Sequence, residues 1–351
     1  MKKAKKRPIL RWVLLALLLV LAALLLINRY TVRQAWCNMF APTLPLDESA
    51  DWSGGTSYEH LAYADDSEAQ YIDLYVPDTQ EPAPLFVLIH GGGFAFNDAQ
   101  SRQAQFMYRY FRDHGFACAS INYRLATEAP FPAAIQDCKA AIRFLRAHAQ
   151  EYGYSADHLS VWGESAGGYL AIMCAVTNDT QFNDLTFIGQ QETGNVTARV
   201  DTLVDYYGLV DSQTLEAQWN ELQIPAFVRQ IANSWLSGDV LEGYEDIHSY
   251  WLRKNISEMT PEEYAVTNPL TYVQQNDLSH LTAWIVHGDC DITVPYLQSA
   301  DFAQVLSEKT APDKVIFKLI PRLGHAADML YSNELLGELD AFLKSIHTPG
   351  K

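Results

Sequence analysis

Short, continuously apolar runs that alternate with amphipathic stretches are the feature that most restricts the fold of this chain. The run 85–89 (LFVLI) contains no polar residue, which is typical of a strand that is buried on both faces. Similar runs recur along the chain, and stretches with helical periodicity lie between them. Because parallel strands need a crossover connection, usually a helix, this alternation predicts a mostly parallel sheet with helices on both faces.

The expected elements cover most of the chain after residue 57. The expected strands are 58–63, 70–76, 85–89, 117–123, 159–162, 202–207, 283–286 and 315–320, with the first two paired antiparallel, and the expected helices are 101–113, 133–152, 166–177, 296–308 and 333–346. The segment 211–265 interrupts this order, because it is rich in Trp and Tyr and has mixed charge. Insertions in such sheets tend to lie at the edge where ligands bind, so we expect a cap over a site, with extra packing as the alternative.

The stretch 163–168, which reads Gly-Glu-Ser-Ala-Gly-Gly, follows an expected strand and precedes an expected helix. A G-x-S-x-G sequence at such a junction puts the serine on a sharp turn, where glycines avoid the collisions that Cβ atoms would cause. The serine hydroxyl then projects above the sheet, near the positive end of the helix. Ser165 is therefore the candidate nucleophile.

A run of three glycines follows His90, at the carboxyl end of the expected strand 85–89. Such a backbone approaches a ligand closely, and its N–H groups are free to form an oxyanion hole, completed by the N–H of Ala166 after the nucleophile. A flexible loop or a phosphate cradle is the alternative. A phosphate loop would require a following Gly-Lys-Ser/Thr, which is absent from the sequence at this point.

Two aspartates compete to be the carboxylate that orients the catalytic histidine. The sequence after the expected strand 283–286 reads His-Gly-Asp-Cys-Asp. The carboxylate must fix the imidazole tautomer and stabilise the imidazolium ion. We favour Asp291, which lies on the loop beyond the strand, whereas Asp289 is closer to the strand end and is expected to brace the turn.

The candidate base is His325, in the Gly-His-Ala sequence after the expected strand 315–320. It is at a carboxyl strand end and comes last in the order Ser165, Asp291, His325, which is the order of α/β-hydrolase triads. The other assignments are surface positions for His148, His158, His248 and His347, and strand-end hydrogen bonds for His90 and His287.

These stretches together resemble the α/β-hydrolase superfamily and, within it, the esterases related to hormone-sensitive lipase and the bacterial feruloyl/acetyl esterases. The resemblance covers about residues 57–348 and also includes Asn-Tyr-Arg-Leu at 122–125 and Pro-Phe-Pro-Ala-Ala at 130–134 with Asp137. It implies an α/β-hydrolase fold with an eight-stranded sheet, and a serine esterase without metal or organic cofactor. The implied site residues are Ser165 as nucleophile, His325 as general acid/base, Asp291 as its partner, and Gly91, Gly92 and Ala166 as oxyanion-hole donors.

The predicted function is that of a serine carboxylesterase whose substrate is a small-molecule ester with a short or aromatic acyl group. Esterified carbohydrate is suggested by the family analogy alone. An amide hydrolase, such as a formamidase or a peptidase-like enzyme, would use the same triad and is the first alternative. A surface binding protein on a degenerate hydrolase fold is the second, although such a protein should have lost a triad residue or an oxyanion glycine, and none is missing.

The charge of the chain argues against one class of binding partner, nucleic acid. The net charge is −17, and the Lys and Arg residues up to Arg33 all precede the first acidic residue, Asp47, so the rest of the chain is still more acidic. Such a body repels polyphosphates, and we expect no nucleic-acid partner.

The 5 cysteines form no C-x-x-C pair, so we expect no metal site of that kind. We expect mostly buried, unpaired thiols, and one disulfide remains compatible with the count. Nothing in the sequence sets the oligomeric state.

The N-terminus has the pattern of a membrane signal. An apolar run covers 12–27 and, as a helix with a rise of about 1.5 Å per residue, would be about 24 Å long, close to a bilayer core of about 30 Å. The excess of basic residues ahead of it predicts that the N-terminus is cytoplasmic and the body outside. The basic residues ahead of the run are Lys2, Lys3, Lys5, Lys6, Arg7 and Arg11.

We therefore expect three parts: a cytoplasmic basic tail with a transmembrane signal-anchor (1–33), a linker (34–56), and the α/β-hydrolase catalytic domain (57–351). Secretion after signal cleavage is the alternative, but the apolar run ends in Leu-Leu-Leu-Ile-Asn-Arg-Tyr, without a small-residue cleavage site. Both interpretations place the catalytic domain outside the cytoplasm.

Overall fold

An eight-stranded sheet forms the centre of the computed structural model. The structure describes residues 7–27, 33, 37, 41–46, 54–230, 241 and 243–347. The strand order is β1-β2-β4-β3-β5-β6-β7-β8. Strand β2 pairs antiparallel with β1 and β4, and the other neighbouring strands pair parallel, which confirms the predicted mostly parallel sheet. The strands are β1 (Gly55–Ala62), β2 (Tyr71–Pro77), β3 (Ala83–Ile89), β4 (Ala117–Ile121), β5 (Tyr154–Glu164), β6 (Thr202–Tyr206), β7 (Thr282–Gly288) and β8 (Val315–Ile320).

The helices follow the predicted alternation, with one expected helix divided in two. The expected helix 133–152 is interrupted at His148, which ends α4 and precedes α5. The α-helices are α1 (Arg7–Ile27), α3 (Arg102–Asp113), α4 (Ala133–Ala147), α5 (Ala149–Tyr152), α6 (Ala166–Val176), α7 (Gln190–Thr193), α8 (Leu215–Glu221), α10 (Ile247–Leu252), α11 (Pro261–Thr267), α12 (Pro269–Gln275), α13 (Leu297–Lys309) and α14 (Asn333–His347).

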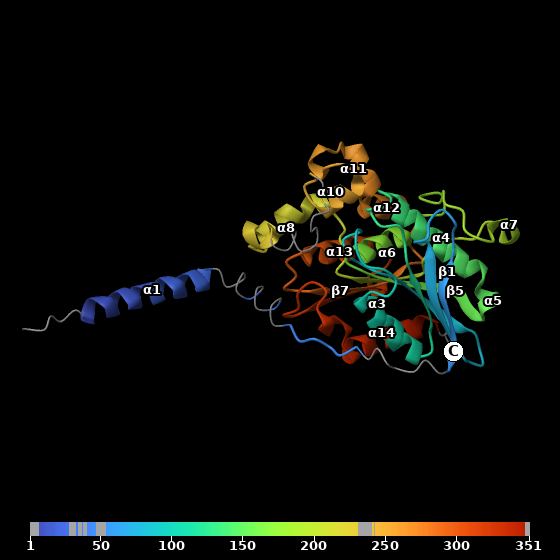
Figure 1. Ribbon diagram of the computed structural model, residues 1–351, viewed down its shortest axis with the longest axis horizontal. Helices are drawn as coiled ribbons and strands as arrows, with labels where there is room; N and C mark the ends of the chain where they lie inside the picture. Colours follow the sequence, from blue (N-terminus) through green and yellow to red (C-terminus); the bar gives the residue numbers. More distant parts are fainter. Residues whose placement is uncertain are drawn as a thin grey trace, which may run out of the picture.

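Helices cover both faces of the sheet, and each face has its own core (Figure 1). Successive side chains of a strand point to opposite faces. In β3, Val87 and Ile89 belong to the core beneath α4 and α6, whereas Phe86 and Leu88 belong to the core beneath α3 and α14. The continuous apolar run at 85–89 is therefore explained by burial on both faces, as predicted.

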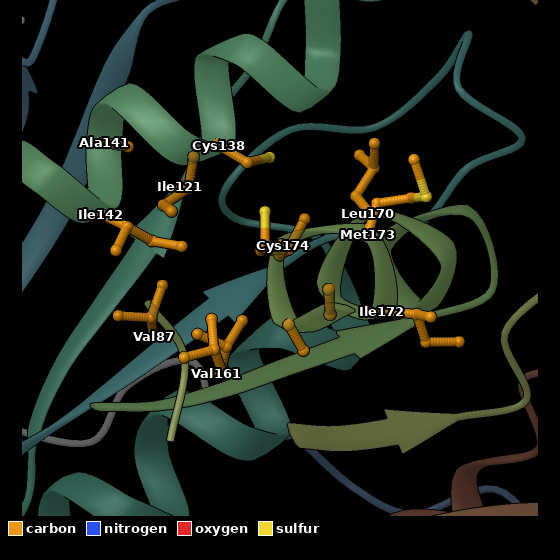
Figure 2. Close-up of a cluster of buried hydrophobic side chains, with 14 of the residues drawn as sticks. Val87, Ile121, Cys138, Ala141, Ile142, Val161, Leu170, Ile172, Met173 and Cys174 are labelled. Atoms are coloured by element: carbon orange, nitrogen blue, oxygen red, sulfur yellow. The ribbon is translucent and has the colours of Figure 1, made fainter. Parts of the chain in front are cut away.

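Figure 2 shows the core between the sheet and helices α4 and α6. Val87 and Val161 project from the strands, and Ile142 and Cys138 come from α4. All eleven residues of α6 are buried, since this helix is enclosed by its neighbours on every side. A helix buried in this way holds its N-terminal residue, next to Ser165, in a fixed place.

The segment 211–265 forms helices outside the two layers. In Figure 1, α8, α10 and α11 form a group beyond α12 and α13. Trp219 of α8 and Trp251 of α10 are both buried, so these two aromatic residues of the segment pack inward. Residues 231–240 and 242, which are part of the expected cap, lie outside the described residues.

The N-terminal region is only partly described. Within the described residues no helix combines the length and the apolarity needed to cross a membrane. The transmembrane helix predicted within 1–33 stays a prediction, and residues 1–6 and 28–32 lie outside the described residues. Part of the predicted linker packs on the domain: Leu44 joins the core beneath α3 and α14, and its N–H donates to Oδ2 of Asp328 at 2.9 Å.

Candidate active site

Ser165 is at the turn between β5 and α6, with φ 53° and ψ −118°. This positive φ is rare for a residue with a side chain, and the turn needs glycine on both sides of it. A Cβ on Gly163 would be 2.0 Å from the carbonyl oxygen of Gly167, and a Cβ on Gly167 would be 2.2 Å from that of Ile89. The G-x-S-x-G sequence thus forms the tight strand-to-helix turn that it predicts.

The three predicted triad side chains lie together at the carboxyl ends of their strands. The Oγ atom of Ser165 is 2.9 Å from Nε2 of His325, and Nδ1 of His325 is 2.6 Å from Oδ2 of Asp291. An N–H at Nδ1 donates to the carboxylate, which leaves Nε2 to accept the hydroxyl hydrogen of the serine. The competing carboxylate, Asp289, instead accepts the N–H of Arg322 at 2.6 Å and braces the turn.

The Asp291 carboxylate is buried but well compensated. Its Oδ1 accepts the N–H groups of Thr293 at 2.8 Å and Val294 at 2.9 Å. Burial alone would raise its pKa, but the contacts with His325 and His287 hold the pKa well below the ordinary value. Asp291 is therefore ionised at neutral pH and can stabilise a positive charge on His325.

His287 is a second histidine on the same carboxylate, a partner that sequence reasoning did not identify. Its Nε2 is 3.2 Å from Oδ2 of Asp291, and its Nδ1 is 2.8 Å from Oγ of Ser299. We predicted a strand-end hydrogen bond for His287, and the structure shows Asp291 itself as one partner. The four-residue spacing of His287 and Asp291 across the end of β7 is the signal that could have indicated it.

Two carboxylates act on the basicity of His325. Burial would lower the pKa of the imidazole, but the charge and hydrogen bond of Asp291, with the charge of Glu164, raise it above its ordinary value. The ring of Tyr207 packs edge-on against the imidazole, with the ring centroids 4.9 Å apart. The two carboxylates favour the protonated form that arises when His325 takes a proton.

The oxyanion hole differs from the prediction at one glycine. The N–H of Gly91 donates to Oε1 of Glu164 at 2.8 Å, so it is not available to an oxyanion. Within the described residues the N–H groups of Gly92, Gly93 and Ala166 have no acceptor. Gly93 thus replaces Gly91 as a candidate donor. The correction has a physical cause, because a buried carboxylate next to the serine needs a donor of its own.

A cavity of about 70 Å³ opens beside Ser165, between the sheet and the 211–265 segment. His248, predicted at the surface, is instead buried against Phe94, with ring centroids 5.7 Å apart, and burial lowers its pKa to about 4. The segment therefore contributes directly to the wall of the site. The lining residues are Gly93, Phe94, Ala166, Leu209, Thr293 and Val294 from the domain, and Leu215, Trp219, Asp246, Ile247 and His248 from the segment.

The arrangement provides the parts needed for acyl transfer: a serine with an adjacent base, an ionised carboxylate behind the base, and free N–H groups beside the serine. In the part of the chain that the structure describes, no group of three or more His, Cys, Asp or Glu side chains is placed to hold a metal ion.

Comparison with known sequences gives related hydrolases. A family model described as BD-FAE matches residues 72–306. Esterase LipC of Mycobacterium tuberculosis is 27% identical over 273 residues, which are 77% of this chain and 60% of LipC. Esterase LipQ of the same organism is 26% identical over 248 residues, which are 70% of this chain and 51% of LipQ. The chain thus spans little more than half the length of these curated relatives.

Comparison with solved structures also gives related proteins. A structure titled "Truncated form of carbohydrate esterase from gut microbiota" aligns with a TM-score of 0.67 and 27% identity, covering 84% of this chain and 98% of that one. A bifunctional GH43-CE protein of Bacteroides eggerthii aligns with a TM-score of 0.65 and 26% identity, covering 82% of this chain and 35% of that one. The sheet and its helices are therefore those of an α/β-hydrolase fold.

Proposed function

Because the chain belongs to the BD-FAE family within the α/β-hydrolase esterases, we propose that it is a serine carboxylesterase. The observation that carries the proposal is the hydrogen-bonded series from Ser165 through His325 to Asp291, with links of 2.9 Å and 2.6 Å. This geometry is what a nucleophile, its base and the orienting group of the base require.

The reaction follows from the protonation states of the three groups. His325 accepts the hydroxyl proton of Ser165 as the serine oxygen attacks the ester carbonyl carbon, and Asp291 stabilises the imidazolium ion. The tetrahedral oxyanion accepts hydrogen bonds from the free N–H groups of the glycine loop and of Ala166. His325 then protonates the leaving alcohol, and it later activates the water that hydrolyses the acyl-enzyme.

The size of the cavity favours a short acyl group. Its volume of about 70 Å³ is far below the roughly 300–1,000 Å³ of typical small-molecule pockets, so it has space for a group of a few heavy atoms, such as acetyl. The similarity to a protein titled carbohydrate esterase supports esterified carbohydrate as the alcohol part. The aromatic acyl groups that the sequence left open would need a larger cavity.

The test is hydrolysis of p-nitrophenyl acetate, butyrate and octanoate by the full chain and by Ser165→Ala. We expect the variant to lose several orders of magnitude in kcat/KM and the wild type to prefer acetate. Ser307→Ala is the matched control, because this serine is on α13 and its hydroxyl donates to the carbonyl oxygen of Ala303 in the same helix. Its activity should equal that of the wild type.

Each other result changes the conclusion in a defined way. Faster turnover of a matched amide would favour the amide hydrolase, and preference for octanoate would contradict the short acyl group. If the wild type hydrolyses neither ester nor amide, and a fluorophosphonate fails to label Ser165, the protein binds rather than cleaves its ligand.

We also propose that the catalytic domain lies outside the cytoplasm and is held by an N-terminal anchor, on the sequence pattern of residues 1–33 alone. Protease added to intact cells should degrade the domain, and the protein should remain in the membrane fraction. Recovery from the culture medium would instead favour signal cleavage, and recovery from the cytoplasm would contradict both.

A further inference from the structure

We propose that Cys37 and Cys290 form a disulfide that ties the N-terminal segment to the loop that carries Asp291. The two Sγ atoms are 2.8 Å apart although the residues are separated by 253 positions in the chain. Both side chains are buried. Since a disulfide bond is about 2.05 Å long, a movement of less than 1 Å would bring the sulfur atoms to bonding distance.

A second contact between the same two segments supports this pairing. The guanidinium of Arg33 forms an ion pair with the carboxylate of Asp289. Arg33 precedes Cys37 by four residues, and Asp289 directly precedes Cys290. The ion pair and the thiol pair therefore join nearby positions of the same two segments. The approach of the two sulfur atoms is therefore part of a larger contact.

The disulfide would also connect to the loop that carries His325. The N–H of Cys290 donates to the carbonyl oxygen of Leu323 at 2.9 Å, and Asp289 accepts the N–H of Arg322. The loops that carry Asp291 and His325 are thus hydrogen-bonded to each other at the residues that contact the N-terminal segment. We infer that the disulfide holds this edge of the site together.

The chemistry balances as a thiol–disulfide exchange with an external disulfide, such as oxidised glutathione or a dithiol oxidase. The Cys37 and Cys290 thiols lose two protons and two electrons as their S–S bond forms, and the external disulfide is reduced to two thiols. Burial raises the pKa of the Cys290 thiol, so exchange is faster before the site has folded than after. The proposed location outside the cytoplasm is an oxidising compartment, in which disulfides persist. The disulfide does not depend on the proposed esterase activity.

The test is to refold the full chain in glutathione redox buffer, to alkylate it in denaturant without reductant, and to map its peptides by mass spectrometry. We expect a Cys37–Cys290 linked peptide. The internal control is Cys118, which is buried in β4 and should be alkylated. Alkylation of both Cys37 and Cys290 in protein that has regained its native circular dichroism would overturn the proposal, and so would a link to any other cysteine.

A second measurement separates the disulfide from the packing of the thiols. Reductant should lower the Tm of the oxidised wild type by about 5–10 °C, because the bond closes a long loop. With or without reductant, Cys37→Ala should have the Tm of the reduced wild type. Equal Tm values for oxidised and reduced wild type would contradict a stabilising disulfide even if the linked peptide forms.

Discussion

Among single residues, Glu164 acts on both the glycine loop and His325. Its Oε1 accepts the N–H of Gly91, which fixes the glycine loop, and its charge raises the pKa of His325. His325 must be neutral to accept the proton of Ser165, so activity should be lost as the pH falls through the pKa of this imidazole. The charge of Glu164 therefore influences the pH at which the enzyme becomes active.

Glu164→Gln separates the charge from the hydrogen bond. The amide oxygen of glutamine still accepts the N–H of Gly91, but the pKa of His325 falls because one negative charge is removed. We expect the acidic limb of the profile of kcat/KM against pH to move to lower pH. The matched control is Glu262→Gln on the exposed side of α11, which should leave the limb in place. A limb that moves to higher pH in Glu164→Gln would contradict this account.

His287 should act as a positioning residue for Asp291. We expect His287→Ala to lower kcat by about 10- to 100-fold with little change in KM, because the carboxylate loses a contact that orients it. His287→Gln should recover part of the loss, because its amide N–H can donate to the same oxygen. Steady-state kinetics that give a raised KM and an unchanged kcat would assign His287 to substrate binding instead.

The sequence predicted that Ser165, Asp291 and His325 would lie together because each follows a strand, and strand ends meet at one edge of a parallel sheet; the structure places their side chains in hydrogen-bond contact. The sequence did not identify the roles of Glu164, His287 and His248. The partner of His287 is only four residues away, and that spacing is a local signal. Glu164 and His248, in contrast, contact residues from distant parts of the chain, and no local pattern encodes a contact of that kind. The same limit explains why Gly91 was assigned to the oxyanion hole, since the acceptor of its N–H lies 73 residues away.

Among the elements, the turn between β5 and α6 is the one most constrained by its glycines. We expect Gly163→Ala to lower the free energy of unfolding by about 3 kcal/mol or more, because its Cβ would overlap the carbonyl oxygen of Gly167. Gly337→Ala is the control. Gly337 is in α14, and a Cβ on it would be 3.5 Å from the hydroxyl of Tyr110, which is an ordinary contact distance. Urea denaturation should find that variant as stable as the wild type or about 0.5–1 kcal/mol more stable. Equal stability of both variants would show that the turn can relax.

The contribution of α8 can be tested through acyl-chain preference. Trp219 is buried and lines the cavity beside Ser165. We expect Trp219→Ala to raise the ratio of kcat/KM for octanoate to that for acetate by about tenfold or more, because the larger cavity accepts a longer chain. Phe227→Ala is the control on the same segment, since this side chain is 62% exposed. An unchanged ratio in the Trp219 variant would place the acyl group elsewhere.

The sheet could be predicted from sequence because burial on both faces produces continuous apolar runs. The break between α4 and α5 could not be predicted from sequence. The residues around His148 are compatible with an uninterrupted helix, so nothing local indicates that α4 ends there. The segment 211–265 was recognised by its composition alone. Its helices are short, and α10 has only 6 residues, so periodicity has too few turns to locate them.

Over the whole molecule, the dominant property is negative charge. The net charge is −17, and 8 of the 25 Lys and Arg residues lie within the first 33 positions, ahead of the first acidic residue, so the rest of the chain is still more acidic. Asp246 lines the cavity, Glu164 is buried next to Ser165, and Asp291 is buried within the triad. The long-range field and the local charges therefore have the same sign, and both should disfavour an anionic substrate as it approaches Ser165.

This field predicts a salt dependence that differs between substrates. For an ester with a carboxylate on its alcohol part, kcat/KM should rise about tenfold between roughly 10 mM and 500 mM salt, because the Debye length falls from about 30 Å to a few Å. For the neutral ester of the same size, kcat/KM should change by less than about twofold, since screening acts only on the charged substrate. Parallel salt series with the two esters measure the difference directly. Equal slopes would mean that the acidic surface lies too far from the site to act on substrates, and that acyl and alcohol selectivity is set by the cavity alone.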